Sequence, residues 1–137
     1  MNQNDPKYLF RVPQNALIIE NKKVLVLKRA MDEKSFAGLW DLAGGRLEHG
    51  ENLKESLMRE VKEETNLEVN ILNLVSAFVT EVKDGFGVFL IYNCKKISDD
   101  IKVCKDDHST YLWATKEEIE KLKKTPVLKY CLDEKLI

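Results

Sequence analysis

Five charged residues stand at spacings that could support metal-dependent chemistry: Glu51, Arg59, Glu60, Glu63 and Glu64. On a helix, residues three and four positions apart have their Cβ atoms about 5–6 Å from one another, so the last three could share one small site. Clustered carboxylate oxygens are the ligands that hard divalent cations prefer. The spacing therefore indicates a cluster that could hold Mg²⁺ or Mn²⁺, the ions expected as cofactors.

The element that must position these carboxylates is a helix predicted from about Leu53 to Thr65. Asn52 is a favourable N-cap residue, and Glu55 follows three positions later as in a capping box. Asn66 stands where a left-handed residue would end the helix. The start and the end of the helix are therefore both marked in the sequence.

On a helical wheel of this segment the glutamates fall towards the apolar side. The apolar side is formed by Leu53, Leu57, Val61 and Leu67. Glu60 and Glu64 fall within its arc, and Glu63 falls at its edge. Like charges on an inward face cost free energy through desolvation and repulsion unless a cation compensates. A Glu-rich helix with a solvated acidic face is the alternative interpretation of the helix alone.

The residues around this helix resemble the signature of the Nudix hydrolase family, GX5EX7REUXEEXGU, in which U is an aliphatic residue. Residues 45–67 match the signature at every fixed position except Asn66, where the signature has Gly. Asn tolerates the left-handed conformation better than most residues, so the change is mild. Residues 39–45 are similar to the family's Leu-Trp-x-x-Pro-Gly-Gly element, with Ala43 in place of Pro.

The resemblance implies an α/β (α+β) Nudix fold, a mixed β-sheet sandwiched between helices, in a single domain over residues 1–137. It also implies a metal-dependent pyrophosphohydrolase that cleaves a nucleoside diphosphate linked to another moiety. The compact chain is similar to MutT-like members, which favours a nucleoside triphosphate, oxidised ones included, split into monophosphate and pyrophosphate. The alternatives are an ADP-ribose, ADP-sugar or dinucleotide hydrolase and an inactive nucleotide-binding domain.

The resemblance assigns roles by position in the signature. The implied metal ligands are the carbonyl of Gly44 and the carboxylates of Glu60, Glu63 and Glu64. Glu51 and Arg59 correspond to a structural ion pair that holds the preceding loop against the helix. The catalytic base differs among relatives, so Glu60, Glu63 and Asp107 are all left open for that role.

Positions outside the helix complete the hypothesis. Asp107 lies six residues before Trp113, where relatives carry an acidic residue that acts as a further metal ligand or base; a polar loop is the alternative. His108 is interpreted as a loop residue. Arg29 ends a predicted strand where relatives meet substrate phosphates, a role that suits a guanidinium, and Gly45 is expected to contact substrate as well.

A base-binding region is less well marked in the sequence. The resemblance suggests residues 124–127 beside the base. Aromatic side chains that could stack on a base are Phe36, Trp40, Phe78, Phe86 and Phe89, although each of them has core or loop packing as its more frequent role.

The rest of the chain predicts strands joined mainly by hairpins. The predicted elements are a hairpin over 16–28 with its turn at 21–23, a polar loop over 30–39, a short strand over 40–42, strands over 70–83 and 88–95 around a turn at 84–87, short strands over 101–104 and 111–114, and helices over 115–123 and from Pro126.

Composition restricts the class of protein further. The chain has 137 residues, a formal net charge of −1 and three scattered cysteines, which predicts one cytoplasmic domain with free thiols. The charge offers no case for a nucleic-acid partner, and no apolar run approaches the ~18 residues that would indicate a membrane partner. A small-molecule nucleotide is the expected partner. Dimers are frequent in the family, which leaves a homodimer open.

Overall fold

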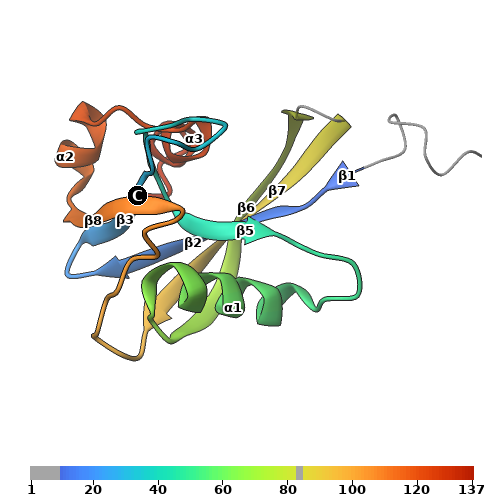
Figure 1. The fold of residues 1–137 in the computed structure, drawn as a ribbon, viewed down its shortest axis with the longest axis horizontal. Helices are drawn as coiled ribbons and strands as arrows, with labels where there is room; N and C mark the ends of the chain where they lie inside the picture. The colour runs from blue at the N-terminus through green and yellow to red at the C-terminus, as the bar shows by residue number, and fades with distance from the viewer. Residues whose placement is uncertain (1–9, 83–84) are drawn as a thin grey trace, which may run out of the picture.

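A computed structural model describes residues 10–82 and 85–137. Figure 1 shows a twisted sheet with α1 on one face and α2 and α3 on the other. The elements in chain order are β1 (Phe10–Arg11), β2 (Pro13–Glu20), β3 (Lys23–Arg29), β4 (Trp40–Asp41), β5 (Ala43–Arg46), α1 (Leu53–Thr65), β6 (Val69–Val82), β7 (Gly85–Lys96), β8 (His108–Ala114), α2 (Lys116–Lys121) and α3 (Pro126–Asp133).

The sheet is mixed, as expected, and β2 is its central strand. β2 pairs in parallel with β7 and antiparallel with both β3 and β5. The hairpin from β2 to β3 turns through Asn21 and Lys22, whose positive φ angles of 50° and 63° match the primed turns that suit twisted hairpins. The β6–β7 hairpin contacts α3 through Phe78 and Tyr130, and its tip extends beyond both α1 and α3 (Figure 1).

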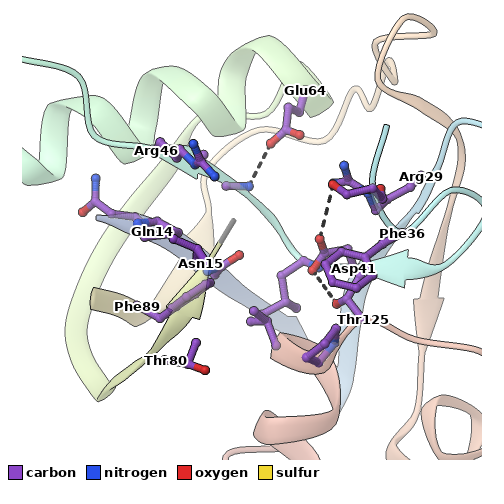
Figure 2. A pocket seen from close by; sticks show the side chains of 18 of the residues that line it. Gln14, Asn15, Arg29, Phe36, Asp41, Arg46, Glu64, Thr80, Phe89 and Thr125 are labelled. Carbon is purple, nitrogen blue, oxygen red and sulfur yellow. Dashed lines mark hydrogen bonds and ion pairs between the residues drawn. The ribbon is translucent and has the colours of Figure 1, made fainter. Parts of the chain in front are cut away.

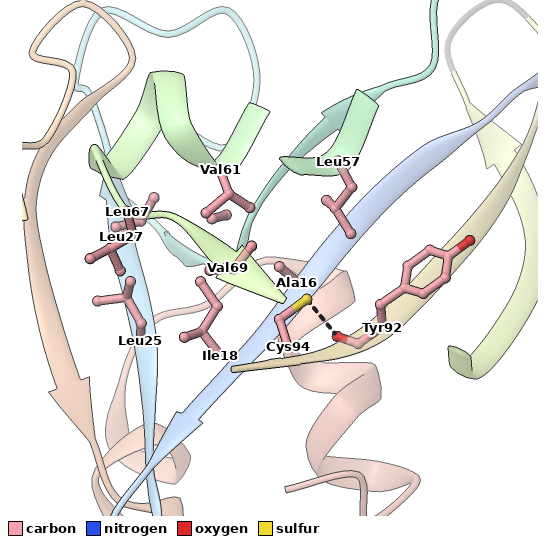
Figure 3. Close-up of a cluster of buried hydrophobic side chains, with 11 residues drawn as sticks. Ala16, Ile18, Leu25, Leu27, Leu57, Val61, Leu67, Val69, Tyr92 and Cys94 are labelled. Carbon is pink, nitrogen blue, oxygen red and sulfur yellow. Dashed lines mark hydrogen bonds between the residues drawn. The ribbon is translucent and has the colours of Figure 1, made fainter. Parts of the chain in front are cut away.

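Two hydrophobic cores lie on opposite faces of this sheet, because alternate side chains of a strand point to opposite faces. Ile18 of β2 packs on the side of α1, with Leu57 and Val61 (Figure 3). Leu17, the preceding residue, packs on the side of α3, with Leu128. The expected sandwich of a mixed sheet between helices is therefore confirmed.

Helix α1 has the bounds that its caps predict. The side chain of Asn52 accepts hydrogen bonds from the backbone N–H groups of Lys54 and Glu55, and Asn66 is left-handed with φ 68°. The helical wheel predicts that Leu53 faces the core, and this prediction is wrong, because Leu53 is 40% exposed. A wheel gives the direction of a side chain but does not show whether any other element lies opposite to cover it.

The strand predicted over residues 101–104 is wrong. The N–H groups of Lys102 and Cys104 donate instead to the carbonyls of Thr65 and Glu64, at 2.9 and 3.1 Å. Carbonyls in the last turn of a helix lack partners within the helix, so this extended segment satisfies them. The segment also ties the carboxylate-bearing end of α1 to the start of β8.

Smaller differences concern where elements begin and end. Part of the turn predicted over 84–87 is wrong, because β7 already begins at Gly85, which pairs with Val82; Lys83 and Asp84 lie outside the described residues. Helix α2 ends at Lys121 rather than at residue 123. Strand β1 was not predicted. None of the helices in the described ranges is long and apolar enough to cross a membrane.

Candidate active site

A cavity of about 810 Å³ opens between β2, β5, the loop after β3 and the start of α3 (Figure 2). Its wall combines three carboxylates, three cationic side chains and two aromatic rings. The carboxylates are Asp41, Glu64 and Glu81, the cations are Arg29, Lys34 and Arg46, and the rings are Phe36 and Phe89. A mostly apolar hollow with a few converging charged groups is the usual form of a small-molecule site.

Two glycines allow β5 to approach both of its neighbours. A Cβ atom at Gly44 would lie 2.0 Å from the backbone oxygen of Gln14 on β2. A Cβ atom at Gly45 would lie 2.5 Å from the carboxyl carbon of Glu60 on α1. The Gly-Gly pair therefore brings the backbone of β5 against the carboxylates of α1, and both glycines line the cavity.

Of the glutamates in the signature, Glu64 is the one that lines the cavity. Its Oε1 accepts a hydrogen bond of 2.8 Å from the N–H of Gly44, and its side chain is only 10% exposed. Burial raises the pKa of Glu64 well above the ordinary value; the Gly44 hydrogen bond opposes this effect, while the charge of Glu60 adds to it. The structure thus fixes one carboxylate where its negative charge is poorly solvated.

His108 was misread as a loop residue. It is the first residue of β8, it is 3% exposed, and its Nδ1 lies 3.4 Å from Oε2 of Glu64. Burial lowers the pKa of His108 to about 4, so the imidazole is neutral at pH 7 and the contact is not an ion pair. Nδ1 has no hydrogen-bond partner in the part of the chain that the structure describes. The polar sequence around His108 concealed this position, since only the strand pairing of β8 reveals it.

The other signature carboxylates gather around Arg59. Its Nη2 lies 2.8 Å from Oε2 of Glu51 and 3.2 Å from Oε1 of Glu60, and its Nη1 lies 3.1 Å from Oε1 of Glu63. Glu51 also accepts hydrogen bonds from the N–H of Glu48 and the hydroxyl of Ser56, which joins the loop to the helix. The guanidinium therefore sits among three carboxylates beside the cavity.

Of the remaining sequence candidates, Arg29 lines the cavity and Asp107 does not. Arg29 donates through Nε to the carbonyl of Ser35 at 3.0 Å, and its guanidinium lines the cavity 3.7 Å from Asp41. Asp107 is exposed in the turn before β8 and is not part of the cavity wall. Its charge nevertheless raises the pKa of Glu64, as a minor contribution after burial.

The base-binding region predicted from the sequence agrees with the cavity in part. Of the five aromatic candidates, Phe36 and Phe89 line the cavity, and Trp40, Phe78 and Phe86 do not. Three of the residues in the range 124–127 also line it, namely Thr125, Pro126 and Val127. The polar side chains that were missed are Gln14, Asn15, Lys34, Ser35, Asp41, Arg46, Thr80 and Glu81. A polar pair at the start of the otherwise apolar strand β2, Gln14-Asn15, was the available signal.

The donor groups near α1 have the chemistry of a divalent cation site. Across residues 10–82 and 85–137, no group of three or more His, Cys, Asp and Glu side chains converges closely enough to hold one in this arrangement. The donor chemistry nevertheless fits, because Glu60 and Glu64 are both desolvated and burial raises the pKa of each. Two poorly solvated carboxylates next to a backbone of glycines form a set that a divalent cation would neutralise.

Comparison with known proteins agrees with the signature. The sequence model of the NUDIX domain matches residues 10–134. The chain is 34% identical over 116 residues to nucleoside triphosphatase NudI of Klebsiella pneumoniae, covering 75% of this chain and 81% of that protein. It is 28% identical over 114 residues to the NudI protein of Escherichia coli O81, covering 75% and 80%.

Solved structures share the fold. A MutT NUDIX hydrolase from Burkholderia pseudomallei superposes with a TM-score of 0.81 at 22% identity, covering 91% of this chain and 97% of that one. The MutT protein from Methanosarcina mazei Go1 gives a TM-score of 0.79 at 27% identity, covering 92% and 91%. Members of the family generally require a divalent metal ion. The chain belongs to the Nudix family and is a MutT-like Nudix hydrolase, an enzyme that acts on phosphoric anhydrides of small-molecule nucleotides.

Proposed function

We propose that the enzyme hydrolyses a nucleoside triphosphate to the monophosphate and pyrophosphate. The observation that carries this proposal is that the buried carboxylate of Glu64, the cations Arg29, Lys34 and Arg46 and the ring of Phe89 all line one cavity. Figure 2 shows Glu64, Arg29, Arg46 and Phe89 around it. Cations beside a carboxylate suit a substrate that brings phosphates and a divalent ion together. The NudI relatives, named as nucleoside triphosphatases, support the same substrate class.

The proposed metal ligands are the carboxylates of Glu60, Glu63 and Glu64 and the carbonyl of Gly44, and the proposed ion is Mg²⁺ or Mn²⁺. When bound, the cation supplies charge neutralisation at the diphosphate and activation of a water molecule. Glu60 and Glu63 would then exchange contacts with Arg59 for contacts with the ion. Glu51 would keep the guanidinium in place through the 2.8 Å contact that already joins it to Arg59.

Residues of this chain then bind and orient the substrate. Arg29 can form paired hydrogen bonds with phosphate oxygens, and the charge of Lys34 and Arg46 adds to the attraction. The backbone of Gly45 can approach the phosphates because no side chain intervenes. The catalytic base that accepts the proton of water is proposed among Glu60, Glu63 and Asp107, of which Glu63 and Asp107 are exposed to solvent and Glu60 is partly buried.

We propose further that the chain functions as one domain in the cytoplasm and without a nucleic-acid partner. The three unpaired cysteines are compatible with a reducing compartment. Light scattering after size exclusion distinguishes the monomer from a homodimer.

A turnover screen with Mg²⁺ and Mn²⁺ tests the function. The panel comprises the common and 8-oxidised nucleoside triphosphates, ADP-ribose, NADH and dinucleoside polyphosphates, with products identified by chromatography. We expect a monophosphate and pyrophosphate from a triphosphate, and no product without a divalent ion. Pyrophosphate absent from every triphosphate reaction, with a dinucleotide or ADP-ribose cleaved, would replace the proposal by that activity.

The variant Glu60→Gln tests the metal assignment. It keeps the shape of the side chain and removes its charge, so we expect kcat/KM to fall by roughly 10³-fold. Glu55→Gln, on the solvent side of α1, is the matched control. Turnover of Glu60→Gln within a few-fold of wild type would show that Glu60 is not a ligand.

A further inference from the structure

Two polar side chains face the cavity at its end away from α1, and the proposed chemistry uses neither. Asn15 of β2 is 8% exposed and lines the cavity. Asp41 of β4 lines the cavity as well. Figure 2 shows Asn15 and Asp41 on facing sides of the hollow, with Phe89 next to Asn15. Polar groups at these depths require partners, since a buried group without one costs free energy.

The two oxygens of Asp41 have different surroundings. Oδ1 accepts from the N–H of Leu42 at 2.8 Å and from the hydroxyl of Thr125 at 2.9 Å. The Thr125 hydroxyl in turn accepts from the N–H of Leu128 at 3.4 Å, so its single proton is committed to Asp41. Within residues 10–82 and 85–137, the only polar group found near Oδ2 is the guanidinium of Arg29, at 3.7 Å. One oxygen is thus held in place and the other is available to a ligand.

The available oxygen is an acceptor. Burial raises the pKa of Asp41 above its ordinary value, and the hydrogen bonds from Leu42 and Thr125 and the charge of Arg29 oppose this effect by stabilising the ionised carboxylate. A carboxylate accepts hydrogen bonds and donates none. A ligand group opposite Oδ2 must therefore present an N–H.

The walls around this pair are suited to a flat ring. Leu42, Phe89, Pro126 and Val127 provide apolar surface along the same stretch of the cavity. Phe89 is the first ring of a stack in which Phe78 lies 4.9 Å behind it and Tyr130 lies 4.1 Å from Phe78. A ring backed in this way is fixed in orientation and can support a nucleobase by stacking.

We propose that Asn15 and Asp41 select the base of the substrate, and that they favour nucleotides whose base carries an exocyclic amino group. This inference rests on the proposed function and specifies its substrate class. Adenine, cytosine and guanine each offer an N–H₂ group to Oδ2 of Asp41. Uracil and thymine offer one ring N–H between two carbonyl oxygens, which the carboxylate repels. Asn15 donates or accepts at the neighbouring position of the base, because its amide offers both groups.

The test compares kcat/KM for ATP, CTP and GTP with kcat/KM for UTP and dTTP. A hydrogen bond to a buried charged group discriminates by about 10–100-fold, so we expect the best amino-bearing substrate to exceed UTP by that factor. Asp41→Asn replaces an acceptor by an amide that can donate to a carbonyl, and should reduce or invert the ratio. Asp133→Asn, on the exposed side of α3, is the matched control and should leave the ratio unchanged.

Asn15→Leu provides a second, independent variant, because Asn15 has no contact with Arg29 among the described interactions. It should lower the ratio of kcat/KM for the best amino-bearing substrate to kcat/KM for UTP, without the changes in phosphate binding that Asp41→Asn can cause. Thermal melting reports whether each variant is folded. Calorimetric titration with CMP and UMP gives the same comparison as ratios of Kd when a variant has little turnover.

Three results overturn the base-selection proposal. They are a wild-type preference for UTP or dTTP, a ratio unchanged within twofold in both variants, and equal Kd values for CMP and UMP in wild type. Failure of the proposed function is recognised separately. In that case no triphosphate yields pyrophosphate, while the monophosphate titrations still report whether the cavity selects a base.

Discussion

Glu63 and Glu64 are adjacent on α1, and the structure gives them opposite surroundings. Glu63 is 58% exposed and belongs to an outer group of carboxylates around Arg59. Glu64 is 10% exposed and belongs to an inner group with the N–H of Gly44 and the ring of His108. The outer group is held by a flexible cationic side chain, whereas the inner carboxylate is held by backbone. The difference indicates that the outer contacts can be exchanged while Glu64 provides a fixed point for the site.

Of these two adjacent glutamates, Glu64 should show the larger effect when its charge is removed. Glu64→Gln keeps the hydrogen bond from Gly44 and removes the anion, so we expect kcat/KM to fall by roughly 10³-fold, as for loss of several kcal/mol of metal-assisted stabilisation. Glu63→Gln should lose less, since its side chain is exposed and exchangeable. Steady-state assays with Mg²⁺ measure both. An equal loss in the two variants would remove the distinction between the inner and the outer group.

His108 tests how the inner carboxylate is oriented. His108→Leu fills a similar volume but removes the polar atom 3.4 Å from Glu64, and we expect Mn²⁺ affinity to fall about 10–100-fold, as for other residues that orient metal ligands. Electron paramagnetic resonance of free Mn²⁺ measures the affinity without turnover. His49→Leu, in the exposed loop before α1, is the control. Unchanged Mn²⁺ affinity in His108→Leu would assign His108 to packing alone.

These two positions also show what the sequence could reveal. Glu64 was placed correctly on an inward face because helical periodicity fixes side-chain direction from local spacing. The position of His108 was not predicted, because its burial depends on the pairing of β8 with β3. In this pairing Arg29 lies opposite His108, which comes 79 positions later in the chain. The periodicity of one segment carries no information about a partner so distant.

The same contrast holds elsewhere in the molecule. Caps such as Asn52 and Asn66 are local, and they fixed the bounds of α1. The segment over 101–104 has the composition of a strand, but its N–H groups bond to the end of α1, which only the tertiary structure decides. Asn15 and Asp41 become parts of one cavity only after β2 and β4 are placed in the sheet. Long-range placement, rather than local conformation, is what the sequence alone left undetermined.

The inner group predicts how stability of the metal-free protein depends on pH. Burial raises the pKa of folded Glu64 well above 4.5, while the unfolded chain keeps the ordinary value. The folded state therefore binds more protons in that window, and its stability falls as the pH rises from 4.5 through the raised pKa. Glu64→Gln should not show this fall, and should melt at a higher temperature than wild type at pH 7 without metal.

Thermal melting between pH 4.5 and 8 in chelator measures this dependence. Added Mn²⁺ should restore the stability of wild type at pH 7, because a ligand that binds only the folded state stabilises it, by about 2.7 kcal/mol at a hundred times its Kd. The Gln variant should respond less to Mn²⁺. Parallel curves for wild type and Glu64→Gln in chelator would mean that the buried carboxylate is not strained when no cation is bound.

The smallest effect is expected at the outer group. Arg59→Lys keeps the positive charge but loses the planar donors that contact Glu51, Glu60 and Glu63 together. Because the side chain of Arg59 is 37% exposed, solvent screens these pairs, and the free energy of unfolding should fall by only about 0.2–1 kcal/mol in urea titrations. Arg11→Lys, outside the cluster, is the control. A fall in the free energy of unfolding well above that range, together with a loss of activity as large as in Glu64→Gln, would show that the outer group is as fixed as the inner one. Only a rigid guanidinium could then be holding both the loop and the carboxylates in place.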